Sequence, residues 1–279
     1  MAVTLALPFL HLFSGIFMVL LVLRQGWRPA VVEGAIAGAI LVLVYLLAGV
    51  PVKFAFVAVT SAFVPAVVLA LVLQSTRSLA LTMQVSALVA AVAVVALHIA
   101  IDDMAAYWEP VMAQMLEWAQ VNSFDEQALV LQENPGLIAH MMTIGLVLTH
   151  WTMYALYLLF GYRYATMVPG ETGPYGRFCD LSFGRVIALI FAIAAVLGYA
   201  TGMPWLQSLA IVLFAVFWLQ GLAVVHWMVV DGELPLFVVI MVYVLLPFLH
   251  VFLIMALAVV GYTDAWFGYR RRVVTSNEE

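Results

Sequence analysis

Histidine and amide side chains inside long apolar runs are the residues of this chain that could carry chemistry. Gln84 and His98 lie fourteen residues apart in one such run. On a helix turning about 100° per residue they fall within about 40° of each other, and Asp102 continues the same face. A polar side chain in hydrocarbon costs several kcal/mol when it is unpaired, so this face must meet a partner, water or a ligand.

A second polar and aromatic face lies in the run that begins at Leu137. Four residues align on it by the same arithmetic, with Trp151 beside them: Thr143, His150, Tyr154 and Tyr157. This is the longest polar and aromatic stripe in the chain. Its length makes it a strong candidate for a surface that meets a ligand or another helix.

Two further runs carry polar groups. Gln220 and His226 lie in one of them and point to different faces. In the last run Tyr243 and His250 flank Pro247. Because proline has no N–H to donate to the carbonyl of Tyr243, an acceptor is freed close to the side on which His250 projects.

Ten residues on these stripes are therefore candidate binding residues: Gln84, His98, His150, Trp151, Tyr154, Tyr157, Gln220, His226, Tyr243 and His250. Aromatic rings with a few placed polar groups suit a flat, uncharged or weakly charged organic solute. The alternative is that the same side chains only join helices through hydrogen bonds, and for any single residue this packing interpretation is favoured. The solute hypothesis requires several stripes to converge on one hollow.

Metal and catalytic chemistry find little support in the sequence. No HxxxH or HExxH pair places two histidines on one helix face, so we predict no metal and no cofactor. The chain has no GxSxG elbow, no phosphate-binding glycine loop and no pair of carboxylates in the middle of an apolar run. We therefore expect a protein that is not an enzyme.

The composition places these residues in a membrane. Of 279 residues, 67% are hydrophobic and 9% are charged, and the mean hydropathy is +1.15. A soluble domain has about 25% charged residues, so this chain could not cover a water-facing surface. The net charge of -5 argues against nucleic acid as a partner. The single cysteine, Cys179, excludes an internal disulfide and a thiolate metal cage.

The sequence predicts an all-α, polytopic transmembrane helix bundle of about eight spans. A span needs about 20 mostly apolar residues, and eight charge-poor runs are of this kind: Leu5–Leu23, Glu33–Val50, Phe54–Leu73, Ser78–Ile101, Leu137–Gly161, Val186–Gly202, Trp205–Val230 and Leu234–Gly261. We expect one integral membrane domain over residues 1–272 and a polar tail over 273–279. The lipid bilayer is its certain partner.

Charges in the loops predict the orientation. Arginines follow the first, third and fifth runs, so these loops, including residues 162–185, should be cytoplasmic. Residues 102–136 contain seven acidic residues and no Lys or Arg, and should face outward. Eight spans then leave both termini outside, which conflicts with the arginines at 270–272. Either one helix is miscounted or the tail is an exception, and the last run, with Pro247, is the first place to look for an error.

The outward loop should contain an amphipathic helix. Apolar residues from Met104 to Ala119 recur at steps of three and four, while glutamates and glutamines take the other face. Such a helix either covers the bundle or forms a lid over a ligand pocket. Its acidic polar face differs from the lysine-rich type that binds anionic lipid.

Four stretches resemble the YybS-like family of uncharacterised bacterial integral membrane proteins. They are FVPAVVLALVLQSTRSLAL from Phe63, the run from Tyr162 to Arg185, LQGLAVVHWMV from Leu219 and VVGYTDAWFGYRRR from Val259. The last two phrases are the most specific, and the positions that fit include Gln220, Gly221, Gly261, Asp264, Trp266 and Arg270. At the level of helical plan only, the family is similar to the substrate-binding components of energy-coupling-factor transporters and to MreD.

The resemblance implies a multi-pass protein of the bacterial inner membrane. Together with the polar stripes, it favours a component of a transporter that binds a small solute, without an ATPase of its own and so with partner ATPase subunits. The alternative is a structural or scaffolding membrane protein that docks partner proteins. Fold analogy alone does not transfer a function.

Overall fold

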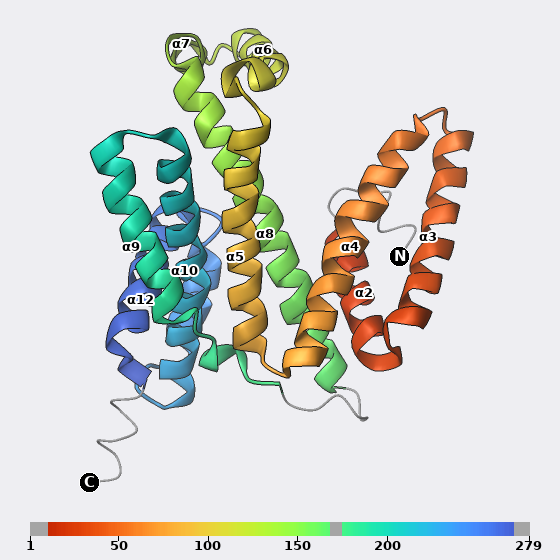
Figure 1. Ribbon diagram of the computed structural model, residues 1–279, viewed down its shortest axis with the longest axis vertical. Coiled ribbons are helices and arrows are strands. Elements are labelled where there is room, and N and C mark those ends of the chain that lie inside the picture. Colours follow the sequence, from red (N-terminus) through yellow and green to blue (C-terminus); the bar gives the residue numbers. More distant parts are fainter. Residues whose placement is uncertain (1–10, 168–174, 271–279) are drawn as a thin grey trace. The chain divides into compact units, whose positions relative to one another are not determined.

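The computed structural model describes residues 11–167 and 175–270, and in these ranges the chain forms helices and no strand (Figure 1). The all-α polytopic class is confirmed. The helices are α2 (His11–Gln25), α3 (Trp27–Leu47), α4 (Val52–Thr76), α5 (Leu79–Ala100), α6 (Met104–Val121), α7 (Asp125–Glu133), α8 (Pro135–Met167), η2 (Phe178–Asp180), α9 (Gly184–Thr201), α10 (Pro204–Val230), α11 (Phe237–Leu245) and α12 (His250–Phe267).

Seven helices in the described ranges are long and apolar enough to cross a membrane: α3, α4, α5, α8, α9, α10 and α12. The described part of α2, at 15 residues, is shorter. The predicted amphipathic helix of the 102–136 loop is present as α6, and α7 follows it. Asp103 begins α6 as its N-cap, because its side chain accepts hydrogen bonds from the backbone N–H groups of Ala105 and Ala106.

The chain forms two compact units. Unit 1 contains Met1–Ser86 and His150–Ser182, and unit 2 contains Ala87–Thr149 and Phe183–Glu279. Helices α5 and α8 pass from one unit into the other. Each unit has its own interior and is described by itself.

In unit 1, small residues bring helices into close contact. A side chain at Gly15 of α2 would meet the ring of Tyr157 on α8, and a Cβ at Gly161 of α8 would lie 2.6 Å from the Cβ of Val19. The amide of Gln74 on α4 donates to the carbonyl of Val22 on α2 at 2.9 Å. Glycine at the contact lets two backbones approach where lipid provides no hydrophobic driving force.

In unit 2, α10 is the central helix, and 67% of an apolar 18-residue stretch within it is buried. It crosses α12 at Gly221 and Gly261. A Cβ at Gly221 would meet the carbonyl oxygen of Leu257, and a Cβ at Gly261 would meet that of Phe217. The neighbours at this crossing are backbone atoms, so only glycine fits on either helix.

The predicted last span, Leu234–Gly261, is not one helix. It is divided into α11 and α12 by turn residues around Pro247, and α12 continues to Phe267. Proline removes a backbone donor and clashes with the preceding turn, which accounts for the position of the break. Helix α11, with nine residues, is about 14 Å long and too short to cross alone.

The end of α12 lies beside the start of α9. Arg185 donates to the carbonyl of Trp266 at 3.2 Å, whereas Met255, earlier in α12, lines a pocket with Tyr199 at the far end of α9. Helix α12 therefore runs opposite to α9. Helix α10 also runs opposite to α9, so it ends at the end of unit 2 where α9 begins with Arg185. Residues 231–267 therefore start from this end of unit 2 and return to it.

This return passage removes the conflict over the arginines. The chain reverses direction near Pro247 within unit 2, so Arg270 lies at the same end of unit 2 as Arg185, as the positive-inside rule requires. We expect a C-terminal fluorescent-protein fusion to fluoresce and an alkaline phosphatase fusion after Ser123 to be active. An active phosphatase at the C-terminus, with a matched fusion after Arg177 inactive, would contradict this arrangement.

Candidate functional site

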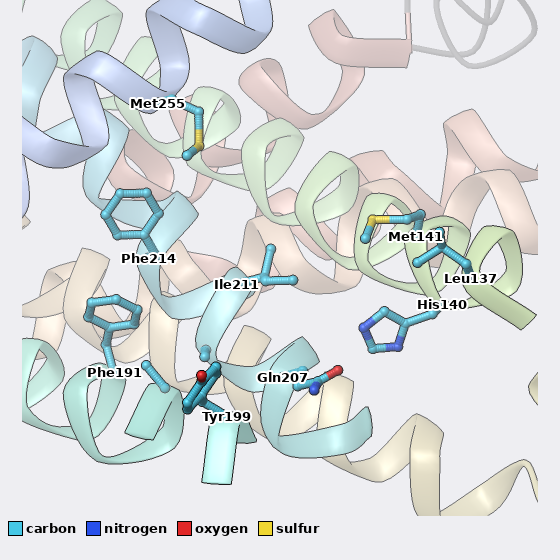
Figure 2. Close-up of a pocket in the computed structure, with 11 residues that line it drawn as sticks. Leu137, His140, Met141, Phe191, Tyr199, Gln207, Ile211, Phe214 and Met255 are labelled. Atoms are coloured by element: carbon cyan, nitrogen blue, oxygen red, sulfur yellow. The ribbon is translucent and has the colours of Figure 1, made fainter. Parts of the chain in front are cut away.

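A pocket of about 520 Å³ lies in unit 2 (Figure 2). Leu137, His140 and Met141 place it at the start of α8, the end of that helix that follows α7. Its lining is mostly apolar and comes from α8, α9, α10 and α12: Leu137, His140, Met141, Phe191, Ala195, Tyr199, Gln207, Ala210, Ile211, Phe214 and Met255. Figure 2 shows the polar groups His140, Gln207 and Tyr199 toward one side and Phe191, Phe214 and Met255 toward the other. The pocket is open, since Tyr199 is 93% exposed, and an open apolar pocket of this size with few polar groups can hold a small organic molecule.

Behind His140 lies a serine between two histidines. The buried hydroxyl of Ser208 on α10 is 3.4 Å from Nε2 of His98 on α5 and 3.3 Å from Nδ1 of His140 on α8. The two imidazole rings are 6.1 Å apart and nearly perpendicular. Three helices thus meet at one polar contact, and one of its members faces the pocket.

A second polar cluster joins α10 to the C-terminal end of α12. Asp264 is buried, and its carboxylate accepts from Gln220 Nε2 at 2.8 Å and from the Arg270 guanidinium at 2.7 Å, both on Oδ2. Gln220 Oε1 accepts from the backbone N–H of Phe183 at 2.7 Å. Among the described residues Asp264 Oδ1 has no partner. A buried charge requires such pairing, so this cluster fixes how the two helices meet.

Comparison with known proteins identifies the family of this chain. A family model described as "Predicted membrane protein (DUF2232)" matches residues 1–265. The chain belongs to the DUF2232 family. No curated protein and no solved structure matches it. The match establishes a membrane protein of a family without an assigned function, and it includes Gln220, Gly221, Gly261 and Asp264 but ends before Trp266.

In this DUF2232 protein the two most specific phrases form one contact. Gly221 packs against α12, Gly261 packs against α10, and Asp264 binds both Gln220 and Arg270. Trp266 is placed by its carbonyl, which accepts from Arg185. Arg271 and Arg272, at the end of the last phrase, lie outside the described residues. The residues singled out by resemblance therefore hold α10 and α12 together.

The candidate residues of unit 1 form separate contacts. The amide of Gln84 donates to the carbonyl of Ser182 at 2.8 Å, and the indole of Trp151 donates to Ser86 at 3.1 Å. The hydroxyl of Tyr157 lies 2.9 Å from His11 Nδ1. Aromatic contacts extend this last group through Tyr154 to His150, with ring centroids 5.8 Å and 6.0 Å apart.

In unit 2, His226 and Tyr243 form another separate pair. The Tyr243 hydroxyl is 3.3 Å from His226 Nε2, and His226 Nδ1 is 2.8 Å from the carbonyl of Leu222. His250 is exposed at the start of α12. None of the ten candidates is among the residues that line the unit 2 pocket, and their role in binding stays a prediction.

Three residues of these contacts were not predicted from the sequence: His140, Ser208 and His11. His140 precedes Thr143 by three residues, about one helical turn, so the stripe of α8 could have been extended to it. Thr143 itself accepts from the indole of Trp108 at 2.9 Å, which ties α6 to α8. Ser208 gave no signal, because a serine in an apolar helix usually bonds to its own backbone.

Proposed function

We propose that this member of the DUF2232 family binds a small, largely apolar solute in the unit 2 pocket and acts as the solute-binding component of an uptake system in the bacterial inner membrane. The observation that carries the proposal is the pocket itself. Its volume of about 520 Å³ lies within the range of small-molecule sites, and its lining combines aromatic and aliphatic side chains with a few polar groups.

The position of the pocket supports uptake. It lies toward the end of unit 2 that carries the acidic helices α6 and α7, which the charge rule predicts to face outward. Energy would come from a partner ATPase, as the resemblance to energy-coupling-factor components implies at the level of helical plan. Transport and its partner are part of the proposal.

The test compares two tryptophan substitutions on α9, one that narrows the pocket and one that lies outside it. Ala195 lines the pocket, and its neighbour Val196 is 67% exposed on the outer surface of α9. We expect Ala195→Trp to abolish copurification of a small molecule, detected by mass spectrometry, and to remove thermal shifts in a solute panel. Val196→Trp should keep both. Equal behaviour of the two variants, or an empty wild-type protein with no thermal shift, would overturn solute binding.

One observation favours a second candidate, a scaffold that docks partner proteins. Candidate residues on two helices hydrogen-bond to a neighbouring helix, as in Trp151 of α8 with Ser86 of α5 and Gln220 of α10 with Asp264 of α12. Such contacts stabilise a bundle without a ligand. Crosslinking in membranes followed by purification separates the candidates, because a scaffold yields stable protein partners whether or not Ala195 is replaced.

A further inference from the structure

For the hydrogen bonds that join His98, Ser208 and His140 behind the unit 2 pocket, the donor and the acceptor can be assigned. The carbonyl of Val94 can only accept, and it lies 2.8 Å from His98 Nδ1, so this nitrogen carries the proton. In a neutral imidazole the other nitrogen, Nε2, is then an acceptor. The Ser208 hydroxyl, 3.4 Å away, donates its single hydrogen to it.

The same assignment of donors and acceptors extends to His140. Because the Ser208 hydrogen is used on His98, Ser208 Oγ accepts from an N–H of His140, with both ring nitrogens within 3.3 to 3.5 Å. The remaining nitrogen of the neutral His140 ring then holds a lone pair. His140 also lines the pocket, so this nitrogen lies beside a space whose lining is otherwise uncharged (Figure 2).

The charge balance of the pocket selects the ligand. No Asp, Glu, Lys or Arg is among the residues that line it in the described ranges. The titratable neighbours are His98 on α5 and Tyr199 on α9, while α10 and α12 contribute the uncharged Ser208, Gln207 and Met255. A permanent ion would therefore lack a fixed counter-charge, which is costly in an apolar site.

We propose that the solute is a weak acid with an apolar body, and that His140 takes its proton on binding. This inference rests on the proposed function and names the class of its ligand. An N–H bond forms on His140, and the carboxylate and imidazolium form an ion pair. The proton comes from the O–H bond of the undissociated acid, or from solvent when the ligand arrives as its anion. The pocket as a whole gains no net charge. The apolar body lies against Phe191, Phe214 and Met255.

The test compares an acid with its neutral isostere. We use 1-naphthoate and 1-naphthamide as probes, and measure binding by calorimetry in buffers of different ionisation enthalpy, which reports proton uptake. Naphthoate is an anion in neutral solution, so its binding should take up about one proton, and its affinity should fall about tenfold per pH unit on the alkaline side of neutrality. Naphthamide binding should take up none.

Variants separate this inference from the proposed function. His140→Gln should remove proton uptake and weaken naphthoate at least about tenfold, while naphthamide binding is kept. His11→Gln changes a histidine of unit 1 that is neither a candidate binding residue nor part of the pocket lining, and it should leave uptake unchanged. Equal affinities of the two probes without proton uptake would overturn the weak-acid inference and leave solute binding intact. Uptake that survives His140→Gln would also overturn it, as would failure of naphthoate to bind while other solutes still shift the melting temperature.

Discussion

Replacing Arg270 with alanine should lower the free energy of unfolding by about 3 to 5 kcal/mol, because it removes one partner of a buried ion pair. The side chain of Asp264 is 2% exposed and that of Arg270 is 13% exposed. Without Arg270 the carboxylate keeps only the Gln220 amide, and Oδ1 already lacks a partner among the described residues. Unfolding in mixed micelles with increasing denaturing detergent measures the change.

The matched control is the other ion pair of the described residues. Arg177 and Asp180 lie 2.8 Å apart with side chains 65% and 47% exposed, and Asp180 raises the pKa of Arg177 through a hydrogen bond. Arg177→Ala should change stability by less than about 1 kcal/mol, because water screens an exposed pair. Adding Asp264→Asn to Arg270→Ala should restore part of the loss. Equal effects of the two arginine substitutions would show that burial of Asp264 is not what matters.

The second large effect is expected at the crossing of α10 and α12. Gly221→Ala should destabilise the protein by about 3 kcal/mol, the upper end of the range for overpacking. The new Cβ would meet the backbone carbonyl of Leu257, which cannot rotate away, so the helices would have to separate. Gly261→Ala should act in the same way, since its Cβ would also lie 2.7 Å from the backbone nitrogen of Gly221.

Gly145→Ala is the control for this prediction. Gly145 lies within α8, and a Cβ there has open space around it, so alanine should leave stability unchanged or raise it through better helix propensity. Thermal unfolding in detergent, followed by loss of helical circular dichroism, compares the three variants. A destabilised Gly145→Ala protein, or a stable Gly221→Ala protein, would argue against the close crossing.

The helices could be predicted because apolar length is a local property. Runs such as Phe54–Leu73 and Trp205–Val230 became α4 and α10 with small changes at their ends. The α6 helix was predicted from apolar residues that recur at steps of three and four. The return passage after α10 could not be predicted in this way, because Pro247 marks a break but does not say in which direction the chain continues.

The contacts of the candidate site could be predicted less well than the helices, for a related reason. Helical spacing tells which side chains share a face, but not toward which helix that face is turned. Gln220 and Asp264 were both singled out, yet their contact depends on the approach of Gly221 to α12. His140 became significant only through Ser208, a residue 68 positions away in sequence. Whether the stripes converge on a single hollow depends on the rotation of each helix about its axis, which the sequence of one helix does not encode.

The return passage after α10 bears on how the protein is inserted during synthesis. Asp231 and Glu233 precede it and Arg270 follows it, all at one end of unit 2, while the turn between α11 and α12 is the apolar sequence Leu-Pro-Phe-Leu. No charged loop has to be translocated, which would cost about 2.5 to 3.5 kcal/mol per charge at mid-bilayer. The C-terminal hairpin can therefore enter the bilayer from a single side, after the helices that precede it.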